Sequence, residues 1–128
     1  MSAMIITPLD NIEIRDNGLI KLDLEKLNIP KSFIYQYVIS IPPLVIGGNH
    51  KHDHQEIFFS TDENLEVHWI NSRGEKKMAK FKEGNKLSLF QIPSGIPHAV
   101  INTSSYKPAV LVEFADRERK NVEKTVII

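Results

Sequence analysis

The sequence contains no cysteine among its 128 residues. This absence excludes disulfide bonds and thiolate metal ligands, so histidine and the carboxylates are the strong metal ligands that the chain can supply. An excess of charge of one sign is also missing, because 16 basic and 16 acidic side chains cancel. Neither nucleic acid nor an anionic membrane is therefore indicated as a partner, and we expect a small-molecule ligand.

Long apolar runs are absent as well. No segment approaches the roughly 18 apolar residues of a membrane helix, and no basic stretch followed by an apolar run begins the chain. We therefore expect a cytoplasmic protein without a membrane anchor. Its length suits a single domain, which we divide into N-terminal strands (1–31), a central barrel (32–115) and a C-terminal tail (116–128).

Helical periodicity is scarce, and strand patterns take its place. A helical turn or two is indicated at residues 22–28, whereas short runs of alternating apolar residues follow one another along the chain. The run "SFIYQYVISI", residues 32–41, is rich in aromatic and β-branched residues and is followed by two prolines. Its alternation predicts that Phe33, Tyr35 and Tyr37 share one face. The sequence therefore predicts an all-β antiparallel sandwich or small barrel.

Three histidines alternate within "GGNHKHDHQE", residues 47–56, and Glu56 continues the spacing. Alternate residues of a straight strand face one side and rise about 3.3 Å each, so His50 and Glu56 would lie roughly 20 Å apart. One metal ion cannot span that distance. If the stretch contributes to a single site, the chain must bend within it.

Another histidine follows a predicted tight turn in "PSGIPHAVIN", residues 93–102. Pro93 and Gly95 favour the turn, and Pro97 restricts the chain directly before His98. An alternating strand comes next. The turn is expected to hold His98 at the mouth of that strand with little freedom.

The two stretches together resemble the two motifs of the cupin superfamily (RmlC-like). The matching residues are His50, His52 and Glu56 in "HxHxxxE", and Pro93, Gly95, His98 and Asn102 in "PxGxxHxxxN". The resemblance implies an antiparallel double-stranded β-helix, the jelly-roll cupin barrel, with little helix. It also implies a bend at residues 53–55, which would bring Glu56 back beside the two histidines.

A metal site is the next implication of the resemblance. Its ligands would be His50, His52, Glu56 and His98, which suit a divalent transition metal (Zn, Mn, Fe or Ni) with positions open for water or substrate. His54 would then be a solvated residue of the turn, and the alternatives are an exchange with His50 or a role supporting a ligand. Histidines that catalyse or bind a ligand without metal are a further alternative.

The whole chain is similar in order and spacing to single-domain sugar-nucleotide cupins. These include the 3,4-ketoisomerases of dTDP-4-keto-6-deoxyhexoses and the cupin domain of capsular-polysaccharide sugar epimerases. Where they carry arginines suited to diphosphate, this chain has Asn17 and Gly47. The resemblance implies a sugar or a sugar nucleotide as the small-molecule ligand.

This similarity implies an isomerase or epimerase. A histidine would remove a proton next to a carbonyl, and a metal or a hydrogen-bond donor would stabilise the resulting enediolate. The candidate catalytic residues are His50, His98 and Tyr37, and the predicted substrate pocket is lined by Tyr35, Tyr37 and Phe58. The alternatives are an iron-dependent dioxygenase and a non-enzymatic small-ligand-binding cupin. Strand patterns before residue 30 need a pairing partner, and a homodimer would supply one.

Overall fold

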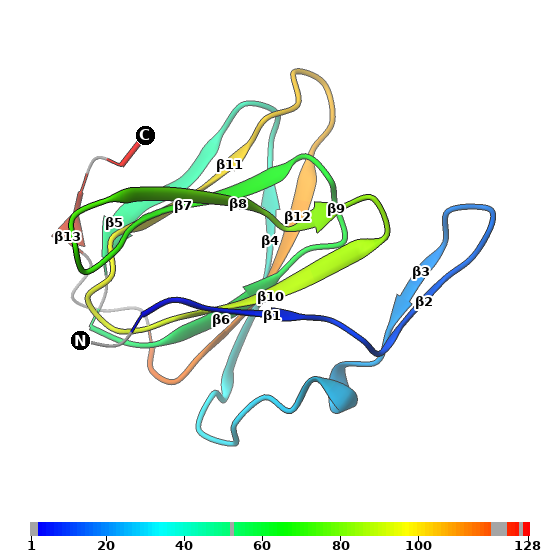
Figure 1. Ribbon diagram of the computed structural model, residues 1–128, viewed down its shortest axis with the longest axis horizontal. Helices are drawn as coiled ribbons and strands as arrows, with labels where there is room; N and C mark the ends of the chain where they lie inside the picture. Colours follow the sequence, from blue (N-terminus) through cyan, green and yellow to red (C-terminus); the bar gives the residue numbers. More distant parts are fainter. Residues whose placement is uncertain (1–2, 52, 119–122, 126) are drawn as a thin grey trace.

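Two antiparallel β-sheets that face each other make up most of the molecule (Figure 1). The computed structural model describes residues 3–51, 53–118, 123–125 and 127–128, without the side chains of residues 49, 50 and 123. Helix in the described part of the chain is limited to the short 3-10 helix η1 (Leu24–Leu27), within the segment predicted to be helical. Among these residues no helix has the length and apolar character needed to cross a membrane.

The strands divide between two large sheets and one small hairpin. The first sheet runs in the order β1 (Ile5–Pro8), β10 (Lys86–Ile92), β6 (Glu56–Phe59), β12 (Ala109–Ala115) and β4 (Tyr35–Ile41), with β9 (Lys82–Glu83) paired to β10. The second runs β13 (Glu123–Lys124), β5 (Ile46–Lys51), β11 (His98–Asn102), β7 (Leu65–Ile70) and β8 (Lys76–Lys80). The hairpin pairs β2 (Ile12–Ile14) with β3 (Ile20–Leu22). The predicted all-β antiparallel fold is confirmed.

The chain passes back and forth between the two large sheets. Strands β4, β6, β10 and β12 lie in the first sheet, whereas β5, β7 and β11 lie in the second. The hairpin between β7 and β8 turns at residues 71–75, where Asn71 N donates to Glu75 O at 3.0 Å. This alternation between two sheets is the connectivity of a jelly roll, the architecture that the sequence predicts.

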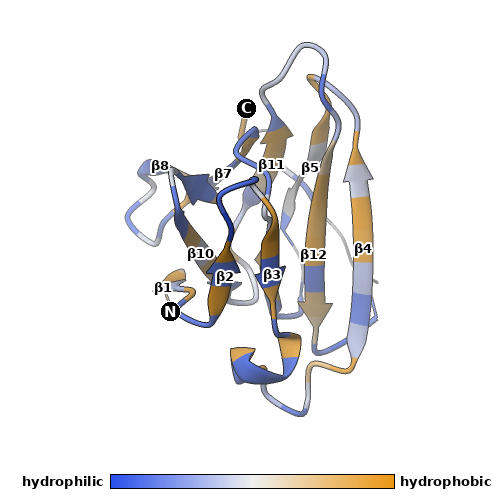
Figure 2. Ribbon diagram, turned by 90° about the vertical axis from the view of Figure 1, so that its right-hand side faces the viewer, coloured by the Kyte–Doolittle hydropathy of each residue, from blue (hydrophilic) through white to orange (hydrophobic). Residues whose placement is uncertain are grey.

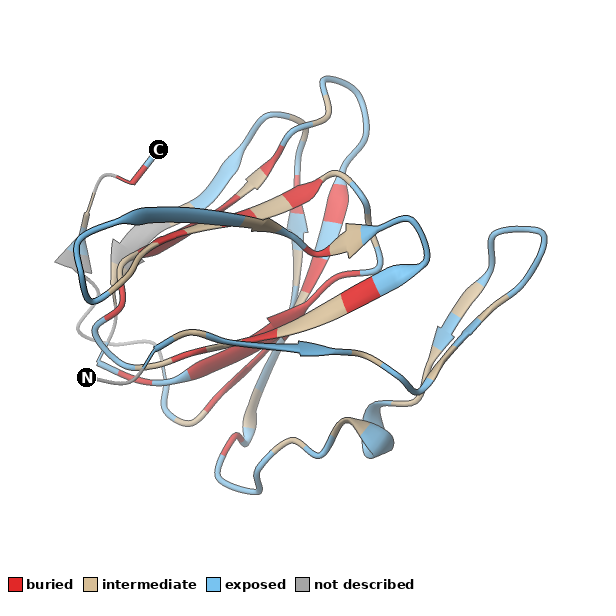
Figure 3. Cartoon of the chain, viewed as in Figure 1, coloured by how far each residue is buried: buried red, intermediate tan, exposed pale blue. Residues whose placement is uncertain are grey.

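The main core fills the space between the sheets. Along β7, Leu65, Val67 and Trp69 are buried there, while the intervening residues are partly exposed. His68 is one of the latter, and its Nε2 lies 3.2 Å from Oε1 of Glu66. The strand therefore shows the period-two burial that its sequence predicts. Figure 3 shows the buried residues gathering on the facing strands, with β1 and β8 exposed.

A second core covers the outer face of the first sheet. Ile57, Phe59 and Phe114 pack there with Phe33, under apolar residues of the N-terminal segment. The prediction that Phe33 shares a face with the two tyrosines of β4 is wrong. The strand begins only at Tyr35, and Phe33 precedes it in a turn in which Phe33 N donates to Pro30 O at 3.0 Å.

The N-terminal strands pair within the chain. β1, which the sequence patterns did not predict, pairs antiparallel with β10 from Ile5 opposite Gln91 to Pro8 opposite Ser88. β2 and β3 form a hairpin beside the large sheets (Figure 1). The strand signals before residue 30 therefore have partners in the same chain, and the homodimer stays a prediction.

Candidate active site

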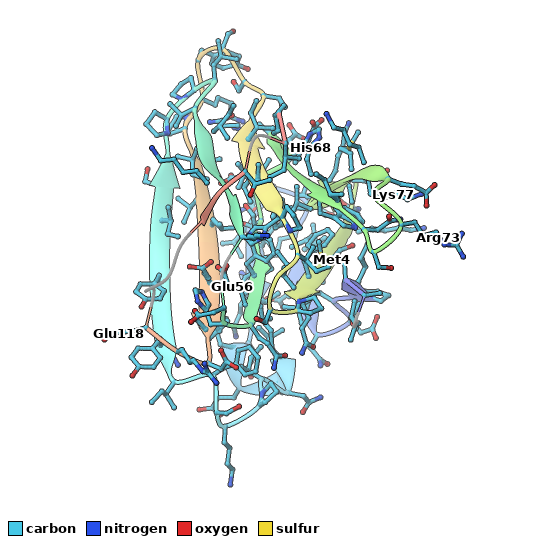
Figure 4. All side chains as sticks on the ribbon, turned by 90° about the vertical axis from the view of Figure 1, so that its left-hand side faces the viewer. Met4, Glu56, His68, Arg73, Lys77 and Glu118 are labelled. Atoms are coloured by element: carbon cyan, nitrogen blue, oxygen red, sulfur yellow. The ribbon has the colours of Figure 1, made fainter. Side chains whose placement is uncertain are left out.

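Glu56 and His98 meet in the interior, between the two large sheets. Glu56 begins β6 in the first sheet and His98 begins β11 in the second. Oε1 of Glu56 lies 3.3 Å from Nε2 of His98, and the two side chains are only 2% and 6% exposed. Figure 4 shows Glu56 in the space between the sheets, apart from His68. Two residues from separate sequence motifs thus form a buried acid–imidazole pair.

The predicted bend brings Glu56 into this position. The backbone bends at Asp53 and His54 before β6 begins. It is attached to the end of β12, because Gln55 N donates to Oδ1 of Asp116 at 2.9 Å and Asp116 N donates to Gln55 O at 3.3 Å. The end of β12 therefore holds the bend that precedes Glu56.

The orientation of His98 is set by the turn before it. Gly95 has φ 84°, and Ile96 N donates to Pro93 O at 3.4 Å. Nδ1 of His98 lies 2.9 Å from the carbonyl oxygen of Ile96. A carbonyl can only accept, so Nδ1 carries the hydrogen and donates it, which leaves Nε2 directed at Glu56.

His54 is a correction to the sequence analysis. It was expected to be a solvated residue of the turn, yet it is only 4% exposed. Its Nε2 lies 3.7 Å from Oε1 of Glu56, and its Nδ1 lies 3.7 Å from Oδ1 of Asp53. The bend turns this side chain inward, so His54 takes part in the site, as one of the stated alternatives requires.

Two of the four predicted metal ligands, Glu56 and His98, have described side chains. His52 lies outside the described residues, and so does the side chain of His50. The backbone of His50 is described, and it lies directly opposite His98 in the register of β5 and β11. Among the described side chains, no group of three or more His, Asp or Glu residues has the arrangement of a metal site.

One pair of described donor atoms, in Glu56 and His98, has a separation that a shared metal ion would also allow. With bonds of about 2.1 Å, two donors lie about 3.0 Å apart at an octahedral centre and about 3.4 Å apart at a tetrahedral one. The separation between Glu56 Oε1 and His98 Nε2 is 3.3 Å. A backbone carbonyl on the other ring nitrogen, as His98 has, is also typical of metal-binding imidazoles.

The predicted aromatic residues lie on strands of the first sheet. The rings of Phe58 and His98 pack edge to face, with their centroids 6.2 Å apart. Phe58 also packs edge to face against Phe81 and Phe90. Tyr35 and Tyr37 lie on β4 on the same face as the buried Ile41, and Tyr37 is 36% exposed. Phe58 thus belongs to the core beneath the site, whereas Tyr37 lies partly in solvent.

Sequence reasoning missed Glu113, a second buried carboxylate on the first-sheet side. It lies on β12, is 4% exposed, and stands opposite Tyr37 on one side and Phe58 on the other. The signal was present in "AVLVEFA", where Glu113 shares a period-two face with three apolar residues (Ala109, Leu111 and Ala115). One acidic residue on an otherwise apolar face is a departure from the usual composition of a buried face.

Gly47 lies over the main core. A side chain there would begin against Ile41, because an added Cβ would lie 3.0 Å from Ile41 Cδ1 and 3.6 Å from the carbonyl oxygen of Val100. This is the position at which the resemblance leads one to expect an arginine. The described structure thus has glycine packed against β4 where such a side chain would start.

Solved structures with a similar arrangement of sheets include sugar isomerases. A dTDP sugar isomerase from Desulfovibrio desulfuricans G20 has a TM-score of 0.75 and 14% identity, covering 97% of this chain and 84% of its own. The chain has the cupin fold. A 3,4-ketoisomerase from Helicobacter canadensis shares the fold with this chain at a TM-score of 0.65 and 23% identity, covering 91% of this chain and 85% of its own.

A longer protein contains the same fold as one part. The capsular polysaccharide assembling protein CapF from Staphylococcus aureus matches at a TM-score of 0.61 and 18% identity, covering 72% of this chain. This chain spans only 28% of the length of CapF. No family model matches the sequence, and no curated protein matches it at a significant level. At these identities the similarity establishes the fold.

Proposed function

We propose that this cupin is a sugar or sugar-nucleotide isomerase or epimerase that transfers a proton next to a carbonyl group. The observation that carries the proposal is the buried pair of Glu56 and His98, 3.3 Å apart between the two sheets. The fold shared with a dTDP sugar isomerase and a 3,4-ketoisomerase supports the same reaction class. An imidazole in a water-poor interior is well suited to take a proton from carbon and return it to a neighbouring atom.

His98 is the residue whose geometry best suits this chemistry. Its Nδ1 donates to the Ile96 carbonyl, so Nε2 is the atom that accepts and returns the proton when no metal is bound to it, and the same atom would be the ligand in a metal-bound form. When Nε2 is protonated, the carboxylate of Glu56 stabilises the imidazolium. His50, opposite His98 in the register, is the second acid–base candidate, and the Tyr37 hydroxyl is a candidate donor to the substrate oxygen. This arrangement would allow a proton to leave one carbon and return to another.

A divalent transition metal (Zn, Mn, Fe or Ni) is part of the proposal. His50, His52, Glu56 and His98 would hold it, with His54 as an alternate ligand. The 3.3 Å separation of the Glu56 and His98 donor atoms and the buried position of His54 support this ligand set. Such a metal, when bound, polarises the substrate carbonyl and stabilises negative charge on its oxygen.

Exchange of a substrate proton with solvent tests the reaction class. The protein is incubated in deuterated water with a panel of free and nucleotide-linked keto sugars, and deuterium is measured by mass spectrometry. We expect incorporation at the carbon next to the carbonyl, and its loss in His98→Ala. His68→Ala is the matched control, because His68 also pairs with a glutamate but outside the interior.

The other outcomes of this experiment identify the alternatives. Absence of exchange for every sugar would contradict the isomerase. Oxygen consumption by the iron-loaded protein would then favour the dioxygenase. If neither exchange nor oxygen consumption occurs, and sugars only raise the unfolding temperature, the protein is a ligand-binding cupin.

We also propose that the protein is a homodimer that associates through β4. This strand is at the edge of the first sheet, paired with β12 in the described structure. Figure 2 shows β4 beside β12 with apolar residues along it, and Val38 and Ile34 are 77% and 68% exposed. An exposed edge with apolar side chains is suited to pairing with a second copy around a two-fold axis.

A further inference from the structure

Glu113 faces the same interior as Glu56. Directly opposed residues of an antiparallel pair project on one face of the sheet, and Glu113 is opposed by Phe58, a member of the main core. Glu56 lies two residues before Phe58 on β6 and therefore projects on that face as well. Both carboxylates are thus buried between the sheets, at 4% and 2% exposure.

The two carboxylates are diagonal neighbours across Ala115. In the register, Ala115 stands opposite Glu56 on one side and Tyr35 on the other, and Glu113 lies two residues earlier on the same strand. Diagonal neighbours of this kind are about 7–8 Å apart along the backbone, within reach of long side chains. The other two corners of this set are Ala115, which contributes only a methyl group, and the core residue Phe58, so both carboxylates border the same part of the interior.

A carboxylate is an unusual side chain for this position in the strand. The inward neighbours on β12 are Ala109, Leu111 and Ala115, so an apolar residue would be expected at position 113. A carboxylate has two oxygens with about four acceptor positions, so it can accept hydrogen bonds from a ligand in addition to interactions within the protein. Glu113 lies opposite Tyr37, which is partly exposed.

We propose that Glu113 determines the substrate class of the site. Its carboxylate accepts hydrogen bonds from an unphosphorylated sugar, donated either by neutral hydroxyl groups or by a protonated amine. It disfavours phosphate at this end of the interior, because Glu113 adds a second carboxylate beside Glu56 to a set of buried side chains whose other titratable members, among the described residues, are His54 and His98. The inference rests on the proposed sugar-binding function and specifies which part of the substrate enters the interior.

Calorimetric binding of three probes tests the proposal. D-fructose supplies neutral hydroxyls, D-glucosamine adds a protonated amine, and thymidine diphosphate supplies phosphate. We expect the native protein to bind one or both sugars. Glu113→Gln should lower the affinity for D-fructose about tenfold, because a charged hydrogen-bond acceptor becomes a neutral one. A much larger loss for D-glucosamine than for D-fructose would identify the amine as the donor. The affinity for thymidine diphosphate should rise in the same variant.

Two further variants keep the result interpretable. Glu83→Gln, on the exposed residue of β9, is the matched control and should bind all probes like the native protein. Glu113→Asp keeps the charge but withdraws it by one methylene, so it should lose sugar affinity without gaining affinity for thymidine diphosphate. Unchanged sugar affinity in both Glu113 variants would overturn the proposal, as would failure of the native protein to bind either sugar.

Proton exchange separates this inference from the proposed function. If deuterium enters only nucleotide-linked sugars, and Glu113→Gln does not alter the rate, the isomerase stands and the role of Glu113 is wrong. If sugars bind through Glu113 without any exchange, the specificity role stands and the isomerase is wrong.

Discussion

Nε2 of His98 lies 3.3 Å from Oε1 of Glu56, so one residue from each large sheet meets its partner inside the barrel. The chain contains a second pair of the same chemistry, because Nε2 of His68 lies 3.2 Å from Oε1 of Glu66 on β7. The inner pair is 6% and 2% exposed, and the outer pair is 25% and 20% exposed. The outer pair therefore serves as a control for the effects of burial and of the site.

Metal content distinguishes the two pairs. We expect protein purified without added metal to contain a transition metal, and His98→Ala to remove most of it, because loss of a ligand weakens binding more than the 10- to 100-fold typical of supporting residues. His68→Ala should retain the native content. The measurement is elemental analysis by mass spectrometry. Equal metal content in native protein and His98→Ala would contradict the proposed ligand set.

Asn102 is expected to be a major source of stability. It is fully buried, and all four hydrogen-bonding positions of its amide are used. Nδ2 donates to the carbonyl oxygens of Ile41 (3.0 Å) and Lys107 (2.7 Å), while Oδ1 accepts from Asn64 Nδ2 (2.8 Å) and Ser104 N (3.0 Å). We expect Asn102→Ala to lower the free energy of unfolding by about 2–4 kcal/mol, since buried partners lose their hydrogen bonds.

Urea unfolding followed by circular dichroism measures this change. Asn64→Ala is the matched comparison, because Asn64 is only partly buried and donates to the Asn102 side chain and to Lys107 O. Asn64→Ala should lower the free energy of unfolding by about 1 kcal/mol. A smaller effect for Asn102→Ala than for Asn64→Ala would show that the network does not depend on Asn102.

Gly47 and Ile41 should be energetically coupled. An alanine at position 47 would place its Cβ 3.0 Å from Ile41 Cδ1, which is too close without movement. We expect Gly47→Ala to cost about 1 kcal/mol in the native background. The Ile41→Val variant lacks Cδ1. In that variant, Gly47→Ala should raise the free energy of unfolding by about 0.4–1 kcal/mol, because alanine reduces the entropy of the unfolded chain. A double-mutant cycle from urea unfolding measures the coupling, and additive effects would contradict the contact.

The proposed dimer depends on the edge strand β4. Light scattering after size exclusion should give twice the chain mass of 14.6 kDa for the native protein. Val38→Lys should give the single-chain mass, because a lysine on an edge strand opposes pairing. Met78→Lys, 52% exposed on the edge strand β8 of the other sheet, is the control and should remain dimeric. A native protein of single-chain mass would show that the homodimer is wrong.

Strands, turns and bends, which depend on residues close together in the chain, could be predicted from the sequence by itself. Period-two alternation predicted strands such as β7, in which one face is buried and the other is partly exposed. The rise of a straight strand required a bend before Glu56, and that bend is present at Asp53 and His54. The turn before His98 was predicted from Pro93 and Gly95, because their backbone preferences act over a few residues only.

The positions that depend on contacts between distant strands were decided only by the tertiary structure. His54 is buried because its bend is attached to Asp116, which follows β12, and Phe33 packs on the outer face because β4 begins two residues later. Glu113 is buried on the face of Phe58 because β12 lies between β4 and β6, which no local pattern encodes. The alternation of apolar and polar residues assigns the residues of a strand to its two faces. Which face becomes the interior is determined only by the packing of the assembled sheets.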